Sequence, residues 1–273
     1  MTDGPEPRDW QGKPVDCDGC RHQDLLARGG CRPRLACVND RYARRLDRFF
    51  ARNPKLAEEY LSHPHFEVRA VAARHCNLFV LSRLTGDPDE TVRASVASRV
   101  PQRLLLQMRS DPEREVRIRV AGRLASAKLA SMMRDADYYV RVIVARRVAP
   151  GLLPFMIDDP ETEVRLTVAR RIDESALPSM MHDPDAQVRT VVANGLPLAL
   201  LPRMLPDPDW RVRLEVAGRI AAQYLPELLH DEEEMVRELA QSRLNGEPSE
   251  LLPANSRART VSAELDQNGR YQS

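Results

Sequence analysis

The chain has 273 residues, and 42% of them are apolar, which is enough to build a core of useful size. Its 41 basic and 40 acidic side chains nearly cancel, so the overall charge does not require a polyanionic partner. Only 5% of the residues are aromatic, which favours the thin apolar layers of a repeat array and argues against a β-sandwich.

The N-terminal residues and the hydropathy pattern bear on where in the cell the protein is expected. Residues 1–7 contain neither a basic nor an apolar stretch, so no secretory signal is predicted. No apolar run approaches the ~20 residues that a bilayer-spanning helix needs. We therefore expect a cytoplasmic protein that has reduced thiols and no membrane partner.

Four of the five cysteines lie within residues 1–38, which we predict to form a separate metal module. The four are Cys17, Cys20, Cys31 and Cys37. Reduced thiols so close together indicate metal, either tetrahedral zinc or an iron–sulphur cluster with four thiolate ligands. Zinc sites usually repeat a tight CxxC, whereas five residues separate the second pair here. Spacing alone leaves both zinc and a [4Fe–4S] cluster open.

Residues 39–62 are expected to form capping helices between this module and the rest of the chain. The larger apolar residues that could cover the first layer of an array are Phe49, Phe50, Leu56, Tyr60 and Leu61. The segment from residue 17 to 50 holds eight arginines against four aspartates, which makes it the best place to look for an anionic partner.

From residue 63 to 254 the sequence repeats eight times with a period of 24 residues. The dipeptide Val-Arg recurs in the same register, its valine being Val68, Val92, Val116, Val140, Val164, Val188, Val212 and Val236. Five residues before each valine stands an aspartate, except in the first unit, which has His63. We number each unit from this residue, so that the Val-Arg pair occupies positions 6 and 7.

Each unit is predicted to contain one α-helix and one short helix. Asp at position 1 can cap the first helix, Pro at position 2 fits its first turn, and an acid at position 3 complements its dipole. Apolar residues at positions 6, 10, 11 and 14, such as Val96 and Val100, share one helical face. A second apolar pair, such as Leu153 and Met156, encloses Pro154, which favours a brief 3₁₀-helix.

The pattern D-P-x-x-x-V-R-x-x-V-A, carried by all eight units, resembles that of the leucine-rich repeat variant proteins. Departures lie at the ends, where His63 and Glu232 replace Asp and Pro, and Ala240-Gln241 replaces Val-Ala. The resemblance implies an all-α fold, a right-handed superhelical solenoid of alternating α- and 3₁₀-helices. It also implies an iron–sulphur centre in the cysteine cluster, which favours [4Fe–4S] over zinc, and it hints at a setting near nitrogen-fixation genes.

The eight position-7 arginines form a regular row with two interpretations. The row could follow a phosphate backbone. Alternatively, the arginines pair inside the array, since seven of them have an acid four residues earlier, as Asp89 precedes Arg93. We favour the internal pairing. Cys76, at the apolar position 14, is expected to be a core residue.

The sequence shows no catalytic constellation. It contains no GxSxG, HExxH or glycine-rich phosphate loop, and its six histidines lack ligand spacing. We therefore predict a non-enzymatic iron–sulphur protein that acts as an interaction scaffold and responds to redox state through its cluster. Its expected partner is another protein, and no small-molecule substrate is predicted. The alternatives are a nucleic-acid-binding protein and an electron-transfer protein. Residues 255–273, polar and aperiodic, are expected to form a mobile tail.

Overall fold

The computed structural model describes residues 4–246, which fold into helices joined by turns and loops. Extended pairing within these residues is limited to two isolated bridges, Arg8 with Pro14 and Arg32 with Ala36, so the all-α prediction is confirmed. The expected tail and the end of the eighth repeat, residues 247–254, lie outside the described residues. The chain divides into two compact units, 1–148 and 149–273, and each is described by itself.

Within the described residues, the helices of the first unit alternate between α and 3₁₀ (η) types. They are α1 (Gln23–Ala27), α2 (Ala43–Arg52), η1 (Pro54–Tyr60), α3 (Phe66–His75), η2 (Leu78–Leu84), α4 (Glu90–Ala97), α5 (Gln102–Gln107), η3 (Met108–Ser110), α6 (Arg114–Arg123), η4 (Ser126–Met132) and α7 (Tyr138–Arg147).

The second unit continues the alternation over its described part. Its helices are η5 (Pro150–Met156), α8 (Thr162–Ala169), η6 (Leu177–Met180), α9 (Ala186–Gly195), η7 (Leu198–Met204), α10 (Trp210–Arg219), η8 (Ala222–Leu228) and α11 (Glu234–Asn245). No helix in the described residues of either unit is long and apolar enough to cross a bilayer.

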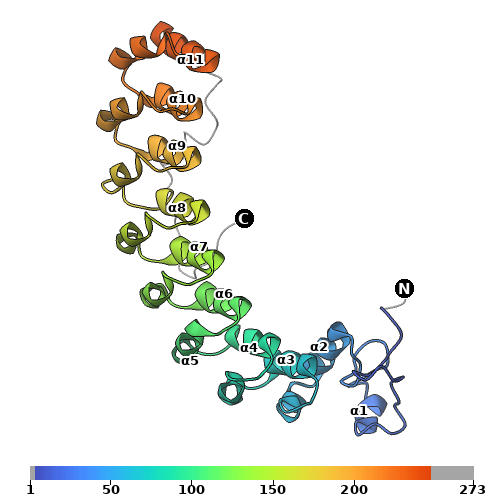
Figure 1. The fold of residues 1–273 in the computed structure, drawn as a ribbon. Helices are drawn as coiled ribbons and strands as arrows, with labels where there is room; N and C mark the ends of the chain where they lie inside the picture. Colours follow the sequence, from blue (N-terminus) through green and yellow to red (C-terminus); the bar gives the residue numbers. More distant parts are fainter. Residues whose placement is uncertain (1–3, 247–273) are drawn as a thin grey trace. The chain divides into compact units, whose positions relative to one another are not determined.

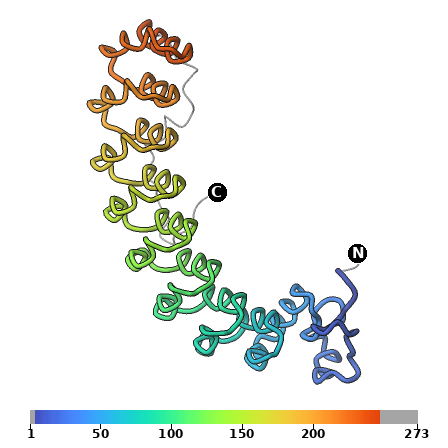
Figure 2. Tube along the Cα trace, viewed as in Figure 1, coloured from blue at the N-terminus to red at the C-terminus, as the bar shows by residue number. Residues whose placement is uncertain are grey.

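Within each unit the long α-helices, from α2 onward, stack side by side in one layer, and the short helices, including α5, form a second layer (Figures 1 and 2). The core lies between the layers, because the apolar positions of both helices in a repeat point there. In the second repeat Val92, Val96 and Val100 are fully buried together with Leu105 of the short segment. Burying a side chain of this size contributes about 1.5–3 kcal/mol. The apolar pattern of the sequence thus identifies the core.

The helix N-caps lie two residues later than predicted. The first α-helix of every described repeat begins at position 4, and its N-cap is position 3. Asp89, for example, accepts a hydrogen bond from the Thr91 N–H through its side chain. The position-1 aspartate instead accepts the N–H of position 3, as Asp87 does from Asp89 at 3.0 Å. Position 1 therefore shapes the loop before the helix and is not the cap.

The short helices are of 3₁₀ type in most repeats, as predicted, and prolines at position 20 are tolerated inside them, as Pro154 is in η5. The second repeat is an exception. There, residues 102–107 form one α-helical stretch, α5, and only the last three residues, in η3, are 3₁₀. Position 20 is Leu106 in this repeat, but η2 and η4 also lack a proline there, so the proline does not by itself decide the helix type.

Candidate metal centre

Two tight turns bring the four N-terminal cysteines together. In the first turn the Cys20 N–H bonds to the Cys17 carbonyl at 3.3 Å. In the second, Arg32 and Ala36 exchange two backbone hydrogen bonds of 2.9 Å and so hold Cys31 and Cys37 at the ends of one loop. The short helix α1 joins the two turns. A CxxC turn and a closed loop thus present two sulphurs each.

All four predicted ligands line a single pocket, whose walls also include Val15, Leu26 and Ala36. Each of the four thiols is partly exposed, and none forms a disulfide. Nowhere in residues 4–246 do three His, Cys, Asp or Glu side chains converge closely enough to hold a single metal ion. The structure thus brings the four predicted ligands to one pocket.

Hydrogen-bond donors from the module reach the sulphur of Cys20. The backbone N–H of His22 and the side-chain amide of Asn39 each lie 3.4 Å from this sulphur. Such N–H···S contacts orient a thiolate ligand and stabilise its negative charge, which also tunes the potential of a bound cluster. His22 and Asn39 were not identified from the sequence, because nothing in the cysteine spacing indicates them.

Burial raises the pKa of three of the four thiols. Burial raises the pKa of Cys37 to about 11, although backbone N–H groups of Asn39 and Asp40 oppose the change. Burial, followed by the neighbouring Cys20 thiol, also raises the pKa of Cys17 and of Cys31. Since metals bind thiolates, loading this site must release protons.

Behind the pocket lies a buried ion pair between Arg45 and Asp40. Both side chains are about 1% exposed, and the guanidinium Nη1 lies 2.7 Å from the carboxylate. Arg45 also donates to the carbonyls of Arg34 and Pro5, and its own carbonyl accepts the Cys37 N–H at 3.2 Å. One side chain of α2 thus fixes three segments of the module.

Arg45 stands 18 residues before His63, the separation that elsewhere joins a position-7 arginine to the next position 1. Because Arg45 is turned toward the module, position 1 of the first repeat needs no carboxylate. His63 keeps the local role of the missing aspartate, accepting the His65 N–H through Nδ1 at 3.0 Å. Burial lowers the pKa of His63, which keeps the ring neutral and able to accept this bond.

The loop from Cys20 to Cys31 is bonded to the capping helices α2 and η1. The buried His22 ring packs on Phe49, and its Nε2 lies 2.5 Å from the Tyr60 hydroxyl. Asn53 donates from its side-chain amide to the Gly30 carbonyl at 2.8 Å. A Cβ on Gly30 would lie 3.1 Å from the Asn53 amide oxygen, so glycine permits this close approach.

The position-7 arginines bond within the array. Arg93 binds both carboxylate oxygens of Asp111 in the next repeat, at 2.8 and 3.0 Å, while its Nη1 donates to the Asp87 carbonyl. The same pairing joins Arg69 to Asp87, Arg117 to Asp135, Arg165 to Asp183, Arg189 to Asp207 and Arg213 to Asp231. Internal pairing is confirmed, but the predicted partner four residues earlier is wrong.

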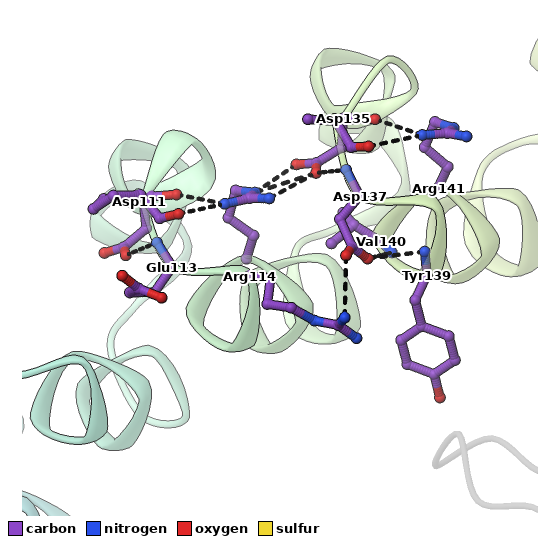
Figure 3. A network of polar contacts seen from close by, with 11 residues as sticks. Asp111, Glu113, Arg114, Asp135, Asp137, Tyr139, Val140 and Arg141 are labelled. Atoms are coloured by element: carbon purple, nitrogen blue, oxygen red, sulfur yellow. Dashed lines mark hydrogen bonds and ion pairs between the residues drawn. The ribbon is translucent and has the colours of Figure 1, made fainter.

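Where the acid four residues before the arginine is an aspartate, its carboxylate caps the helix N-terminus. Figure 3 shows Asp137 accepting the backbone N–H groups of Tyr139 and Val140 and lying 3.4 Å from Arg114. In the same view Arg141 donates to the Asp135 carbonyl. A phosphate would have to compete with these bonds for the paired guanidinium groups.

A second set of arginines, at position 13, caps the C-terminus of the preceding helix. Arg99 donates to the carbonyls of Ala73 and Cys76, both at 2.8 Å. Arg123 contacts Ala97 and Val100 in the same way, and burial lowers its pKa. These arginines satisfy helix-end carbonyls that have no partner within their own helix. Their 24-residue spacing is visible in the sequence, but spacing alone does not indicate which carbonyls they reach.

Cys76 and most of the arginines near the cysteines lie apart from the metal pocket. Cys76 is buried in the core, as predicted. Of the arginines near the cysteines, Arg32 lines the pocket, whereas Arg21 bonds Glu59 and Arg28 bonds Asp24. Arg32 is therefore the one of these three arginines that lies at the metal pocket.

Comparison with known proteins supports both parts of this architecture. A family model described as "LRV protein FeS4 cluster" matches residues 7–59, and another, "Leucine rich repeat variant", matches residues 162–185. The uncharacterized 27.7 kDa protein in the nifB 3' region of Rhodobacter capsulatus is 50% identical over 101 residues. That match spans 37% of this chain and 41% of the relative, less than half of the relative's length.

A solved structure resembles the chain over most of its length. It is described as a leucine-rich repeat variant with a novel repetitive protein structural motif, and it is 41% identical with a TM-score of 0.80. The match covers 84% of this chain and 99% of the other. The chain therefore belongs to the leucine-rich repeat variant family, as a repeat protein with an FeS4 cluster module.

Proposed function

We propose that the protein is a non-enzymatic, cytoplasmic scaffold whose repeats bind another protein and whose N-terminal module carries a [4Fe–4S] cluster. The observation that supports the cluster is the common pocket of Cys17, Cys20, Cys31 and Cys37. Four thiolates on one pocket can ligate a cluster, and the match of residues 7–59 to the FeS4 cluster family model favours iron and sulphide over one zinc ion. A bound cluster supplies one-electron chemistry.

The chain's own residues would hold such a cluster in defined ways. The four cysteines provide the ligands, while the N–H groups of His22 and Asn39 stabilise the Cys20 thiolate. The Arg45–Asp40 pair fixes the loop that carries Cys37. These contacts attach the cluster rigidly to α2, the first helix that stacks on the repeats, so the module can act as the N-terminal cap of the array.

The first experiment is metal analysis of protein purified without oxygen. Iron, sulphide and zinc content would be measured, with an absorption spectrum, in the natural protein and in Cys17→Ser/Cys20→Ser. About four irons and four sulphides, lost in the variant, are expected for a [4Fe–4S] cluster. Cys76→Ala is the control, since Cys76 is buried outside the pocket and should leave iron unchanged. One zinc and no visible absorption would overturn the cluster assignment.

Electron transfer is a second candidate, supported by the partial exposure of all four cysteines. A cluster at the surface lies within reach of a docked redox partner, whereas a purely structural cluster gains nothing from exposure. Potentiometric titration would show a reversible couple if this role holds. The similarity to a protein described as lying in the nifB 3' region supports, on this proposal, a redox partner from nitrogen fixation.

A further inference from the structure

A second cavity lies beside the metal module, between α1 and the junction of α2 with η1. Its volume is about 430 Å³, which falls within the usual range of about 300–1,000 Å³ for small-molecule sites. It is separate from the cysteine pocket, and the two share one wall residue, His22. Neither the repeats nor the cluster ligands account for this cavity.

The walls of the cavity carry an excess of positive charge. Arg28, Arg52 and Lys55 line it against one carboxylate, Asp24. Arg28 bonds that carboxylate one helical turn away. Among the described residues, Arg52 and Lys55 have no ion-pair partner. Two cations that face one cavity without a counter-charge form an anion-binding arrangement, and an arginine fork favours a carboxylate or phosphate group.

The cavity also has an apolar side and a fixed polar floor. Leu25 and Leu56 line it beside the cations, so an occupant with a small carbon frame would gain contacts that a bare inorganic ion does not. Asn53, also in the wall, is held in place by its bonds to the Gly30 and Phe49 carbonyls. These bonds fix the chain between Arg52 and Lys55, whose own side chains are exposed to solvent.

We propose that this cavity binds a small organic polyanion, through its phosphate or carboxylate groups, at Arg52 and Lys55. The site lies next to the cysteine module through the shared His22 wall, so the occupant would contact the same loop that carries Cys20 and Cys31. This inference does not depend on the scaffold or on the identity of the metal.

Isothermal titration calorimetry on the full chain, purified without oxygen, tests the proposal with pyrophosphate and citrate as probes. Saturable binding of at least one probe at one site per chain is expected, and the preferred probe identifies phosphate or carboxylate as the recognised group. Arg52→Gln/Lys55→Gln should weaken this binding about tenfold or more, because charged hydrogen bonds are lost. Arg103→Gln/Lys128→Gln removes the same two charges at exposed positions outside the cavity and should change affinity less than about twofold.

Absence of saturable binding for both probes, or an equal loss in the two double variants, would overturn the proposal. The charge-preserving variant Arg52→Lys/Lys55→Arg should retain most of the binding and shows whether charge or a folding defect explains any loss. Iron content measured on every variant separates this result from the cluster assignment, since Arg52 and Lys55 do not line the cysteine pocket.

Discussion

Arg117 donates hydrogen bonds to both carboxylate oxygens of Asp135, which lies 18 residues further along the chain in the next repeat. The Nε atom is 2.9 Å from one oxygen and Nη2 is 3.1 Å from the other, and the two side chains are only 14% and 7% exposed. Figure 3 shows Asp135 at the start of its repeat, where it also accepts the Asp137 N–H. This pairing links two consecutive repeats within the first unit.

The link should be far more sensitive to Asp135 than to Glu113, the acid four residues before Arg117. Asp135→Asn should lower the free energy of unfolding by about 2–4 kcal/mol, because a mostly buried guanidinium loses its counter-charge. Glu113→Gln should cost less than about 0.5 kcal/mol, since exposed pairs at this spacing contribute little. Urea unfolding of both variants measures the difference, and similar values would contradict the interrepeat pairing.

The position-13 arginines should stabilise the helix ends that they cap. Arg123→Met keeps the side-chain length but removes the donors to the Ala97 and Val100 carbonyls, and should cost about 1–3 kcal/mol. Arg119→Met is the matched control on the same helix α6, because Arg119 is exposed and has no hydrogen bond in the described residues. Thermal unfolding should separate the two variants, and an equal loss would mean that general charge effects dominate.

The Arg213–Asp231 pair should make part of the stability depend on pH. Hydrogen bonding to Arg213, opposed by burial, lowers the pKa of Asp231. The carboxylate therefore adds stability above the unfolded aspartate pKa of about 3.9, and this contribution disappears as the pH falls through the lower folded pKa. The stability difference between the natural protein and Asp231→Asn should shrink steadily below about pH 4. A constant difference across that range would contradict the assignment.

Breaking the Arg45–Asp40 pair should detach the metal module from the array. Arg45→Met leaves the Asp40 carboxylate buried without its partner, at a cost of about 3–5 kcal/mol. The double variant Arg45→Met/Asp40→Leu removes both charges and should recover much of the loss. Chemical unfolding measures the loss of stability, and the iron content of the folded variants measures whether the module still holds its metal. If the double variant were no more stable than the single one, the bonds from the Arg45 side chain to the Arg34 and Pro5 carbonyls would contribute more stability than the ion pair does.

The sequence predicted the parts of this molecule that depend on periodicity. Val92, Val96 and Val100 are buried as their spacing requires, and the four N-terminal cysteines line one pocket. Periodicity assigns each residue a register but does not say which neighbouring unit it contacts. The acid before each arginine therefore looked like its partner, while the true partner lies in the next repeat.

Two further features could not be read from the repeat pattern for physical reasons. The N-cap is position 3, because position 1 is committed to the loop and to the arginine of the previous repeat. Arg45 keeps the register of a position-7 arginine but bonds the module. In the sequence, the altered pairing of Arg45 is indicated only by His63, which stands where the other repeats have aspartate.

The two bonding separations of the position-7 arginine set a rule for how such a chain can change length. Arg213 bonds its own loop six residues back at the Asp207 carbonyl and the next loop 18 residues ahead at Asp231. These separations add up to the 24-residue period. Duplicating or deleting a whole unit within the array would therefore join each arginine to an equivalent aspartate at the new junction. An insertion of a few residues would separate one guanidinium from its carboxylate partner. The number of residues in the array should therefore vary by whole repeats.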